Sequence, residues 1–154
     1  EEDTPADVLV FMVQKEVADR MAAKPGGKDY GALSVAVQYY SHVEKAFSVP
    51  PHCFIPQPEV DSTVVKLSVN KTPPVQLNSR ELFFKTVKAA FGQRRKSLVN
   101  ALYNSGIFIG SKEDIKTLLE NLDIGELQRG ETLSIEQFAQ LSNSLTQKPS
   151  PGSK

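Results

Sequence analysis

The sequence is poor in the residues that build metal centres and disulfides. Among its 154 residues it has one cysteine, Cys53, and two histidines, His42 and His52. A single cysteine excludes an internal disulfide and a multi-cysteine zinc site, and so few histidines argue against metal chemistry. The chain also lacks any apolar run near the ~20 residues that a bilayer-spanning helix needs, and residues 1–10 are acidic where a signal peptide would be basic. We therefore expect a cytoplasmic protein that has no metal site and no contact with a membrane.

The sequence also lacks the motifs that usually form catalytic and cofactor sites. A phosphate or dinucleotide loop needs several spaced glycines between a strand and a helix, whereas Gly26 and Gly27 stand alone between two expected helices. Neither histidine has a strong local partner with which to form a nucleophile and base, so we interpret His42 and His52 as surface or hydrogen-bonded side chains. We interpret Cys53 as a small packed residue. The residues alone therefore point to no complete active site.

Charge is balanced overall but unevenly distributed. The chain has 18 lysines and arginines against 18 aspartates and glutamates, so its formal net charge is zero. Residues 82–112 nevertheless contain no acidic residue, and the basic residues in that range are Lys85, Lys88, Arg94, Arg95, Lys96 and Lys112. Residues 113–146 reverse the sign, with seven acidic and two basic residues. The acid-free segment fits a phosphate-binding patch and equally fits a solvated helix face, and charge alone favours neither.

The first half of the chain has an α/β pattern. Residues 8–13 form a continuous apolar run, which is typical of a strand buried on both faces, as in a parallel α/β sheet. Helix-forming residues follow at 15–23, and a second helix is expected near residues 30–41. Residues 43–49 and 62–69 then read as strands joined by a proline-rich connection, and we expect them to be antiparallel neighbours.

The second half has helical patterns only. A turn-rich segment at 70–79 precedes an apolar stripe of Phe83, Val87, Ala90 and Phe91, and further helices are expected near residues 95–106, 111–122 and 134–146. Capping boxes are predicted for the last two, from Ser111 with Asp114 and from Ser134 with Gln137. We therefore expect a domain over residues 1–76, a helical domain over residues 77–146 and a disordered tail at 147–154.

One aromatic residue stands at the start of a stiffened stretch. Phe54 begins "FIPQPEVDSTVVKL", in which Pro56 and Pro58 follow at alternate positions. Because proline fixes its own φ and restricts the residue before it, these prolines are expected to hold the connection extended and to present Phe54 in one place. The alternative is that Phe54 fills the end of the sheet's core, as aromatic side chains often do.

Five stretches of the sequence, in this order, resemble the carboxyl-terminal half of one enzyme family. They are "VFMVQKEVADRM", "YGALSVAVQYY", "VPPHCFIPQPEVDSTVVKL", "FFKTVKAAFGQRRKSLVNAL" and "RGETLSIEQFAQL". The Phe-x-Pro-x-Pro-x-Val-Asp-Ser pattern and the Gln-Arg-Arg-Lys segment are specific, whereas the other stretches are mostly core patterning. The family is the KsgA (RsmA) small-subunit ribosomal RNA adenine dimethyltransferases, and the resemblance covers essentially the whole chain apart from the tail.

The resemblance implies a fold and a reaction. The fold is an α/β remnant, namely the last strands and helices of a Rossmann-like methyltransferase sheet with an antiparallel hairpin, followed by a small all-α helical bundle. The reaction of the family is the dimethylation of two adjacent adenines of small-subunit rRNA during ribosome biogenesis, with S-adenosylmethionine as the methyl donor. The expected partner is therefore small-subunit rRNA or the immature small ribosomal subunit.

The resemblance also implies roles for particular residues. Phe54 would be the platform on which the target adenine stacks, and Pro56, Pro58, Asp61 and Ser62 would stiffen its loop. The helical domain would dock on rRNA through a set of polar and basic side chains from the acid-free segment. These side chains are Lys85, Lys88, Gln93, Arg94, Arg95 and Lys96.

The sequence departs from the family in lacking its cofactor half. The Gly-rich loop, the acidic residue for the ribose and the Asn-Leu-Pro-Tyr type motif that holds the amine are absent here. We therefore expect this chain to bind no cofactor and to be inactive alone, and we expect its first strand, left with an unpaired edge, to favour self-association. Two alternatives stay open: a non-catalytic RNA-binding ribosome-assembly factor, and a relative of the resistance methyltransferases that act on large-subunit rRNA.

Overall fold

The computed structural model describes residues 6–93 and 95–146. They fold into two compact units, and the division between the units falls between Pro74 and Val75. The expected tail at 147–154, and Arg94, lie outside the described residues. Within the described ranges, no helix combines the length and the apolar character that crossing a membrane would require.

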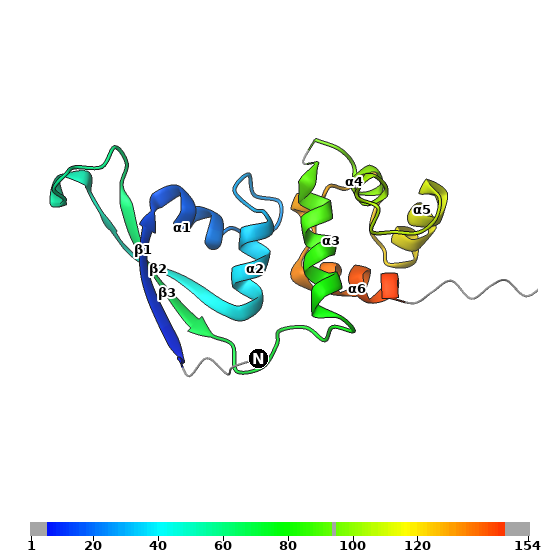
Figure 1. Ribbon diagram of the computed structural model, residues 1–154, viewed down its shortest axis with the longest axis horizontal. Coiled ribbons are helices and arrows are strands. Elements are labelled where there is room, and N and C mark those ends of the chain that lie inside the picture. The colour runs from blue at the N-terminus through cyan, green and yellow to red at the C-terminus, as the bar shows by residue number, and fades with distance from the viewer. Residues whose placement is uncertain (1–5, 94, 147–154) are drawn as a thin grey trace, which may run out of the picture. The chain divides into compact units, whose positions relative to one another are not determined.

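The first unit is built on a three-stranded sheet (Figure 1). Its strands are β1 (Val8–Gln14), β2 (Ser41–Val49) and β3 (Ser62–Val69), in the order β1-β3-β2. Both outer strands run antiparallel to β3. The expectation that the strands near 43–49 and 62–69 are antiparallel neighbours is therefore confirmed. Because β1 and β2 run in the same direction, the chain crosses over between them, and this crossover contains two helices.

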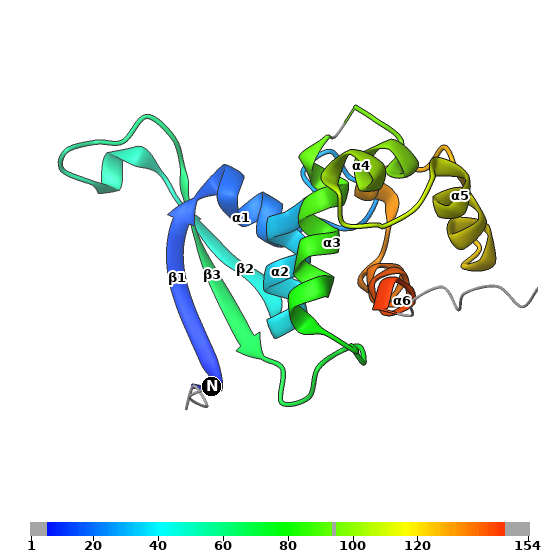
Figure 2. The ribbon, with the colours of Figure 1, turned by 45° about the vertical axis from the view of Figure 1, so that its right-hand side comes forward.

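These two helices, α1 (Lys15–Met21) and α2 (Ala32–Tyr40), lie on one side of the sheet (Figure 2). Their apolar sides and the facing side of the sheet form a buried cluster around Ala18, Met21, Val65 and Leu67. The side chain of Gln38 donates hydrogen bonds from Nε2 to the carbonyl oxygens of Met21 (2.9 Å) and Ala23 (2.8 Å), which fixes α2 against the end of α1. Both helices were expected from the sequence, and both are confirmed.

Strand β1 differs from its expected environment. The sequence predicted a strand buried on both faces within a parallel sheet, but β1 is an outer strand with one antiparallel neighbour among the described residues. Val10 is 62% exposed and Met12 is 53% exposed on the face that turns away from the helices. The expectation is wrong for this chain because a doubly buried strand needs helices over both faces, and the described residues of this unit supply helices over only one.

The second unit is helical. Its elements are α3 (Arg80–Gly92), α4 (Leu98–Ser105), α5 (Lys112–Asn121), the 3₁₀ turn η2 (Gly130–Thr132) and α6 (Ile135–Thr146). Each α-helix turns apolar side chains inward, and the fully buried members of this core include Phe83, Leu98, Leu102, Ile115, Leu119, Leu133, Phe138 and Leu141. The helical interpretation of this half of the sequence is confirmed.

Local capping signals set the ends of these helices. The Ser111 hydroxyl accepts the Asp114 N–H (3.1 Å), and the Asp114 carboxylate accepts the Ser111 N–H (2.7 Å) in return. Ser134 and Gln137 form the same reciprocal pair at α6. Gly106 ends α4 in the left-handed region, with φ 69° and ψ 10°, where glycine carries no Cβ penalty. Both predicted capping boxes and the predicted end of α4 are thus confirmed.

Candidate functional site

The proline-rich connection between β2 and β3 projects beyond the sheet and is bent rather than extended (Figure 1). It opens with a 3₁₀ turn, η1 (Pro51–Cys53), and the Phe54 N–H donates to the Pro51 carbonyl oxygen at 3.1 Å. Bends follow at residues 54–56 and 59–60, and the Ile55–Pro56 peptide bond is cis. The expectation of an extended connection is therefore wrong. Pro51 instead begins a helical turn, a position where its missing N–H is not required.

Phe54 is partly buried at the end of this 3₁₀ turn. It is not part of the buried cluster beneath α1 and α2, so among the described residues it does not fill that core. Its neighbour Ile55 is 102% exposed. Cys53 is exposed as well, which corrects its interpretation as a packed residue, because the turn that carries it stands away from the core. His42 and His52 are exposed, as expected.

The base of the Phe54 loop is fixed to the sheet. The Asp61 carbonyl oxygen accepts the Lys15 N–H at 2.9 Å, where β1 passes into α1. Ser62 is paired with Gln14 on one side and with Val49 on the other, so the carboxyl ends of β1 and β2 meet in one row. In open α/β sheets, ligands bind at the carboxyl ends of strands. The loop therefore leaves the sheet at the end where a ligand site is expected.

A cleft of about 540 Å³ lies at this same end. Residues from the β1–α1 junction line it, and so do Pro51, Glu59, Val60 and Asp61 of the loop, although Phe54 is not among the lining residues. Asp19, also in the lining, accepts hydrogen bonds from Lys45 Nζ (2.8 Å) and Lys15 Nζ (3.1 Å). These two ammonium groups, Lys45 foremost, hold the pKa of the Asp19 carboxyl below its ordinary value. Asp19 is therefore ionised near neutral pH and joins α1 to β2.

The described residues hold no cluster of three or more histidine, cysteine, aspartate or glutamate side chains that could bind a metal ion. The charged groups around the cleft at the carboxyl ends are lysines and carboxylates in mixed order. Such a lining can bind polar ligands and position them. It offers no arrangement of a nucleophile with its base.

The basic and polar residues predicted to bind RNA gather at the junction of α3 and α4. Lys85 and Lys88 are exposed on α3, and Gln93, Arg95 and Lys96 are exposed in the turn that follows it. The Lys96 N–H donates to the Gln93 carbonyl oxygen at 2.8 Å, which closes that turn. The structure thus brings five of the six predicted residues to one region, and the sixth, Arg94, is outside the described residues.

One of these charges is paired with a residue that the sequence reasoning passed over. Lys85 Nζ lies 2.6 Å from Glu81 Oε1, one helical turn earlier. The hydrogen bond from Lys85 lowers the pKa of the Glu81 carboxyl. The acid-free segment begins only one residue after Glu81, so the i, i+4 spacing on a helix was the signal that could have revealed this pair.

A second residue that sequence reasoning missed is Asn104, on α4. Its Nδ2 donates to Gln93 Oε1 at 3.0 Å and so bridges α4 to the end of α3. The two residues are 11 positions apart, with no local pattern to connect them. Lys85, Lys88, Gln93 and Asn104 all line one cleft of about 680 Å³ between these helices.

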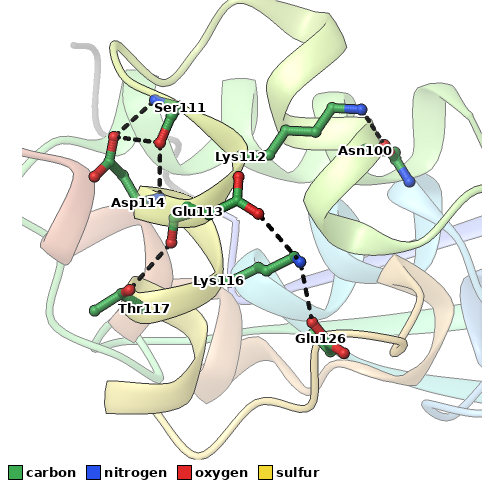
Figure 3. A network of polar contacts seen from close by, with 8 residues as sticks. All are labelled: Asn100, Ser111, Lys112, Glu113, Asp114, Lys116, Thr117 and Glu126. Carbon is green, nitrogen blue, oxygen red and sulfur yellow. Dashed lines mark hydrogen bonds and ion pairs between the residues drawn. The ribbon is translucent and has the colours of Figure 1, made fainter.

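Lys112, the last basic residue of the acid-free segment, has a structural contact instead. Its Nζ donates to Asn100 Oδ1 of α4 at 2.8 Å (Figure 3). It also lies 5.2 Å from the centre of the Tyr103 ring. Tyr103 is 45% exposed. The ammonium group therefore lies over the face of this partly exposed ring, within the range of a cation–π contact.

Lys116, in the mainly acidic range 113–146, is neutralised by acidic residues of the same range. Lys116 lies between Glu113 (3.4 Å) and Glu126 (3.6 Å), as Figure 3 shows. The hydrogen bond and charge of Glu113, followed by the charge of Glu126, raise the pKa of Lys116. Lys116 is thus neutralised by its neighbours, whereas Lys88, Arg95 and Lys96 at the α3–α4 junction form no ion pair with any residue that the structure describes.

Comparisons with known proteins agree on one family. A family model described as ribosomal RNA adenine dimethylase matches residues 1–147. The ribosomal RNA small subunit methyltransferase A of Clostridioides difficile (strain 630) is 54% identical over 150 residues, which cover 97% of this chain and 51% of that protein. Its counterpart in Alkaliphilus oremlandii (strain OhILAs) is 51% identical over 148 residues, which cover 96% of this chain and 51% of that protein. The chain spans about half the length of these curated relatives.

Two solved structures share the fold. A dimethyladenosine transferase from Plasmodium falciparum superimposes with a TM-score of 0.73 at 26% identity, over 90% of this chain and 57% of that one. The 23S rRNA methyltransferase ErmE superimposes with a TM-score of 0.63 at 20% identity, over 95% of this chain and 57% of that one. At this identity the likeness concerns the fold alone. Both are methyltransferases of Rossmann-like type, and the sheet with its two helices is a partial version of that fold. The chain belongs to the ribosomal RNA adenine dimethylase family.

Proposed function

We propose that this chain is the distal part of an S-adenosylmethionine-dependent rRNA adenine dimethyltransferase. In this proposal residues 1–76 are the distal part of the Rossmann-like methyltransferase domain, and residues 77–146 are the RNA-docking helical domain. The whole enzyme dimethylates two adjacent adenines of small-subunit rRNA during ribosome biogenesis. The main support is membership of the family together with the loop that carries Phe54 at the carboxyl ends of β1 and β2.

Phe54 is proposed to stack on the target adenine. A base that is drawn out of its helix must be gripped through its faces, and stacking of a base on an aromatic side chain contributes about 1–3 kcal/mol. Phe54 is partly buried, so its ring is supported, and its loop is anchored through Asp61. The exocyclic amine of adenine is a poor nucleophile because its lone pair is delocalised into the ring. Orientation of that nitrogen is therefore the main contribution that a stacking platform can make.

The described residues do not fit S-adenosylmethionine. The cofactor loop of this fold needs spaced glycines between a strand and a helix. Here β1 passes directly into α1 from Gln14 to Lys15, without a glycine at the junction. We propose that the remaining half of a full-length protein holds the cofactor and that this chain alone transfers no methyl group.

The α3–α4 junction is proposed to dock on small-subunit rRNA. Lys88, Arg95 and Lys96 are exposed in a segment free of acidic residues, which suits contacts to phosphates. Lys85, Gln93 and Arg94 are proposed to take part in the same contact. The immature small subunit would then be held by the helical unit while the loop of the other unit receives an adenine.

The chain is also proposed to self-associate through β1. This strand has no charged residue and no proline over its seven residues, and its outer edge has no partner among the described residues. The other outer strand, β2, contains Glu44 and Lys45, and its pairing is interrupted between Lys45 and Phe47. Charges and bulges of this kind block edge-to-edge pairing, so β1 is the edge that remains open.

The role of Phe54 can be tested in a chimera in which this chain replaces the matching half of the Clostridioides difficile relative. Phe54→Leu should lower the rate of adenine dimethylation on immature small subunits roughly 10- to 100-fold, because aliphatic packing is kept while stacking is lost. Phe54→Tyr is the matched control and should retain most of the activity. Equal losses in the two variants would contradict the stacking role. Methyl transfer by the chain alone would contradict the proposal that the remaining half of a full-length protein holds the cofactor.

A further inference from the structure

The cleft between α3 and α4 has a small-residue floor and a polar rim. Its volume of about 680 Å³ lies within the range of small-molecule and cofactor sites. Leu82, Ala89 and Gly92 of α3, Ala101 of α4 and Ile107 beyond α4 contribute its apolar surface. Because these side chains are mostly short, the floor is open enough to accept a flat group. Of the polar lining residues, Lys88, Gln93 and Asn104 are exposed, whereas Ala89 is partly buried and Ala101 is buried, so we assign the polar groups to the rim.

The hydrogen bond across the rim leaves a donor and an acceptor available. Asn104 Nδ2 donates to Gln93 Oε1, which engages one half of each amide. The other halves, Gln93 Nε2 and Asn104 Oδ1, have no hydrogen-bond partner within the part of the chain that the structure describes, and both residues are exposed. A side chain amide donor beside an amide acceptor matches the paired acceptor and donor on the edge of a nucleobase. The amide pair is therefore suited to reading a base edge.

The charge beside this rim suits a phosphate. Lys88 lines the cleft and is exposed, and it makes no ion pair with any residue that the structure describes. Lys85, the other lysine of the lining, is held by Glu81 at 2.6 Å. Arg95 and Lys96 follow in the adjoining turn, and no acidic residue occurs between positions 82 and 112. An anionic ligand is thus favoured over a neutral one.

We propose that this cleft binds a single unstacked nucleotide of RNA. The base lies on the floor of short side chains, its edge meets Gln93 and Asn104, and its phosphate lies near Lys88. The inference rests on the proposed RNA docking and deepens it, since docking through phosphates alone needs no cleft. Sequence-specific recognition of RNA uses unstacked bases in this way, with hydrogen bonds to their edges.

The test compares two RNAs that share phosphates but differ in bases: an adenine oligonucleotide of about ten residues and an abasic oligomer of the same length. Binding to the 154-residue chain is followed by fluorescence anisotropy. The unchanged chain should prefer the adenine oligonucleotide by roughly tenfold, the scale of one base-edge contact. Ala89→Leu, which fills the floor, should remove this preference and leave the affinity for the abasic oligomer unchanged.

Two further variants sharpen the result. Asn104→Ala removes the free acceptor at an exposed position, so it tests the same preference without altering the packed core. Ala32→Leu, at an exposed position on α2 in the first unit, makes the same substitution at a residue that does not line the cleft and should keep the preference. Helical circular dichroism confirms that each variant is folded.

The outcomes separate the two proposals. Salt-dependent binding of both RNAs with equal affinity would overturn the nucleotide cleft and leave the docking surface intact. A preference for bases that survives both Ala89→Leu and Asn104→Ala would also overturn the cleft. Absence of binding to either RNA would overturn both proposals. Tighter binding of an acidic peptide, lost in Ala89→Leu, would assign the cleft to a protein partner instead.

Discussion

Gly130 lies so close to Ala90 that no side chain fits between them. A Cβ atom on Gly130 would stand 2.8 Å from the Ala90 Cβ and 2.9 Å from the Ala90 carbonyl oxygen. Gly130 is the first residue of η2 and is buried against α3. Its φ is not in the left-handed region, so the requirement for glycine comes from the close approach of two backbones rather than from conformation.

Gly130→Ala should therefore destabilise the helical unit by about 1–3 kcal/mol, the usual range for overpacking a core. Thermal or urea unfolding would measure the change. Gly92→Ala is the matched control, because nothing lies within 4 Å of a Cβ at that position and its φ is not positive. That variant should be neutral or slightly more stable, by up to ~1 kcal/mol. Similar losses in the two variants would contradict the packing argument.

Local signals in the sequence predicted the elements well. Helix ends follow from short-range hydrogen bonds, so Ser111 with Asp114 and Ser134 with Gln137 could be read directly. The apolar stripes likewise identified the buried faces of the helices, and Phe83 and Leu102 are indeed fully buried. Such features depend on residues three or four positions apart, which is the information that a single sequence holds.

Features that depend on distant residues could not be predicted in the same way. The apolar run of β1 indicates a strand, but its exposure depends on what packs against each face, and Val10 is 62% exposed. The Gln93–Asn104 hydrogen bond needs the α3–α4 turn to be in place. At Phe54 the sequence indicated a distinctive loop, while the bent path of that loop followed from a 3₁₀ turn that proline content alone does not reveal.

The Glu81–Lys85 ion pair should weaken RNA binding at the α3–α4 junction. Its distance of 2.6 Å keeps Lys85 engaged within its own helix. Glu81→Gln should free this lysine and raise the affinity for an RNA oligonucleotide roughly twofold, with a steeper dependence on salt. Anisotropy titrations at two salt concentrations would measure both quantities. The control is Glu120→Gln, which removes one negative charge at an exposed position on α5 and should raise the affinity less. Equal effects would indicate that only net charge matters.

The ion pairs of Asp19 should make the first unit sensitive to acid. Lys45 and Lys15 lower the pKa of the Asp19 carboxyl in the folded chain. The ion pairs therefore stabilise the folded state above the pKa that Asp19 has in the unfolded chain, and this stabilisation is lost as the pH falls through the pKa in the folded chain. Asp19→Asn should therefore cost roughly 0.5 kcal/mol at neutral pH, and this difference should vanish well below about pH 4. Urea unfolding at several pH values would measure it.

The control for Asp19 is the same change in a chain that already carries Lys15→Met and Lys45→Met. Asp19→Asn removes no ion pair in that background, so its effect on stability should be small at every pH. A loss that is as large in that background, or one that persists in acid, would show that Asp19 stabilises the unit through packing rather than through charge.

A charge placed on β1 should prevent the proposed self-association. Val10 is the suitable position because it is 62% exposed and is paired across the sheet with Lys66. Val10→Glu therefore adds a charge to the open edge strand while meeting an opposite charge within the unit, which limits any cost to folding. Sedimentation velocity over a wide concentration range should show a dimer for the unchanged chain and a monomer for the variant.

The matched control is Ser48→Glu, at an exposed position on β2. That strand already has Glu44 and Lys45 and an interrupted pairing, so a further charge there should leave the association unchanged. Loss of the dimer in both variants would mean that added negative charge alone separates the copies. A strict monomer for the unchanged chain at every concentration would show that the apolar edge of β1 tolerates water without a partner, and the edge argument would then fail.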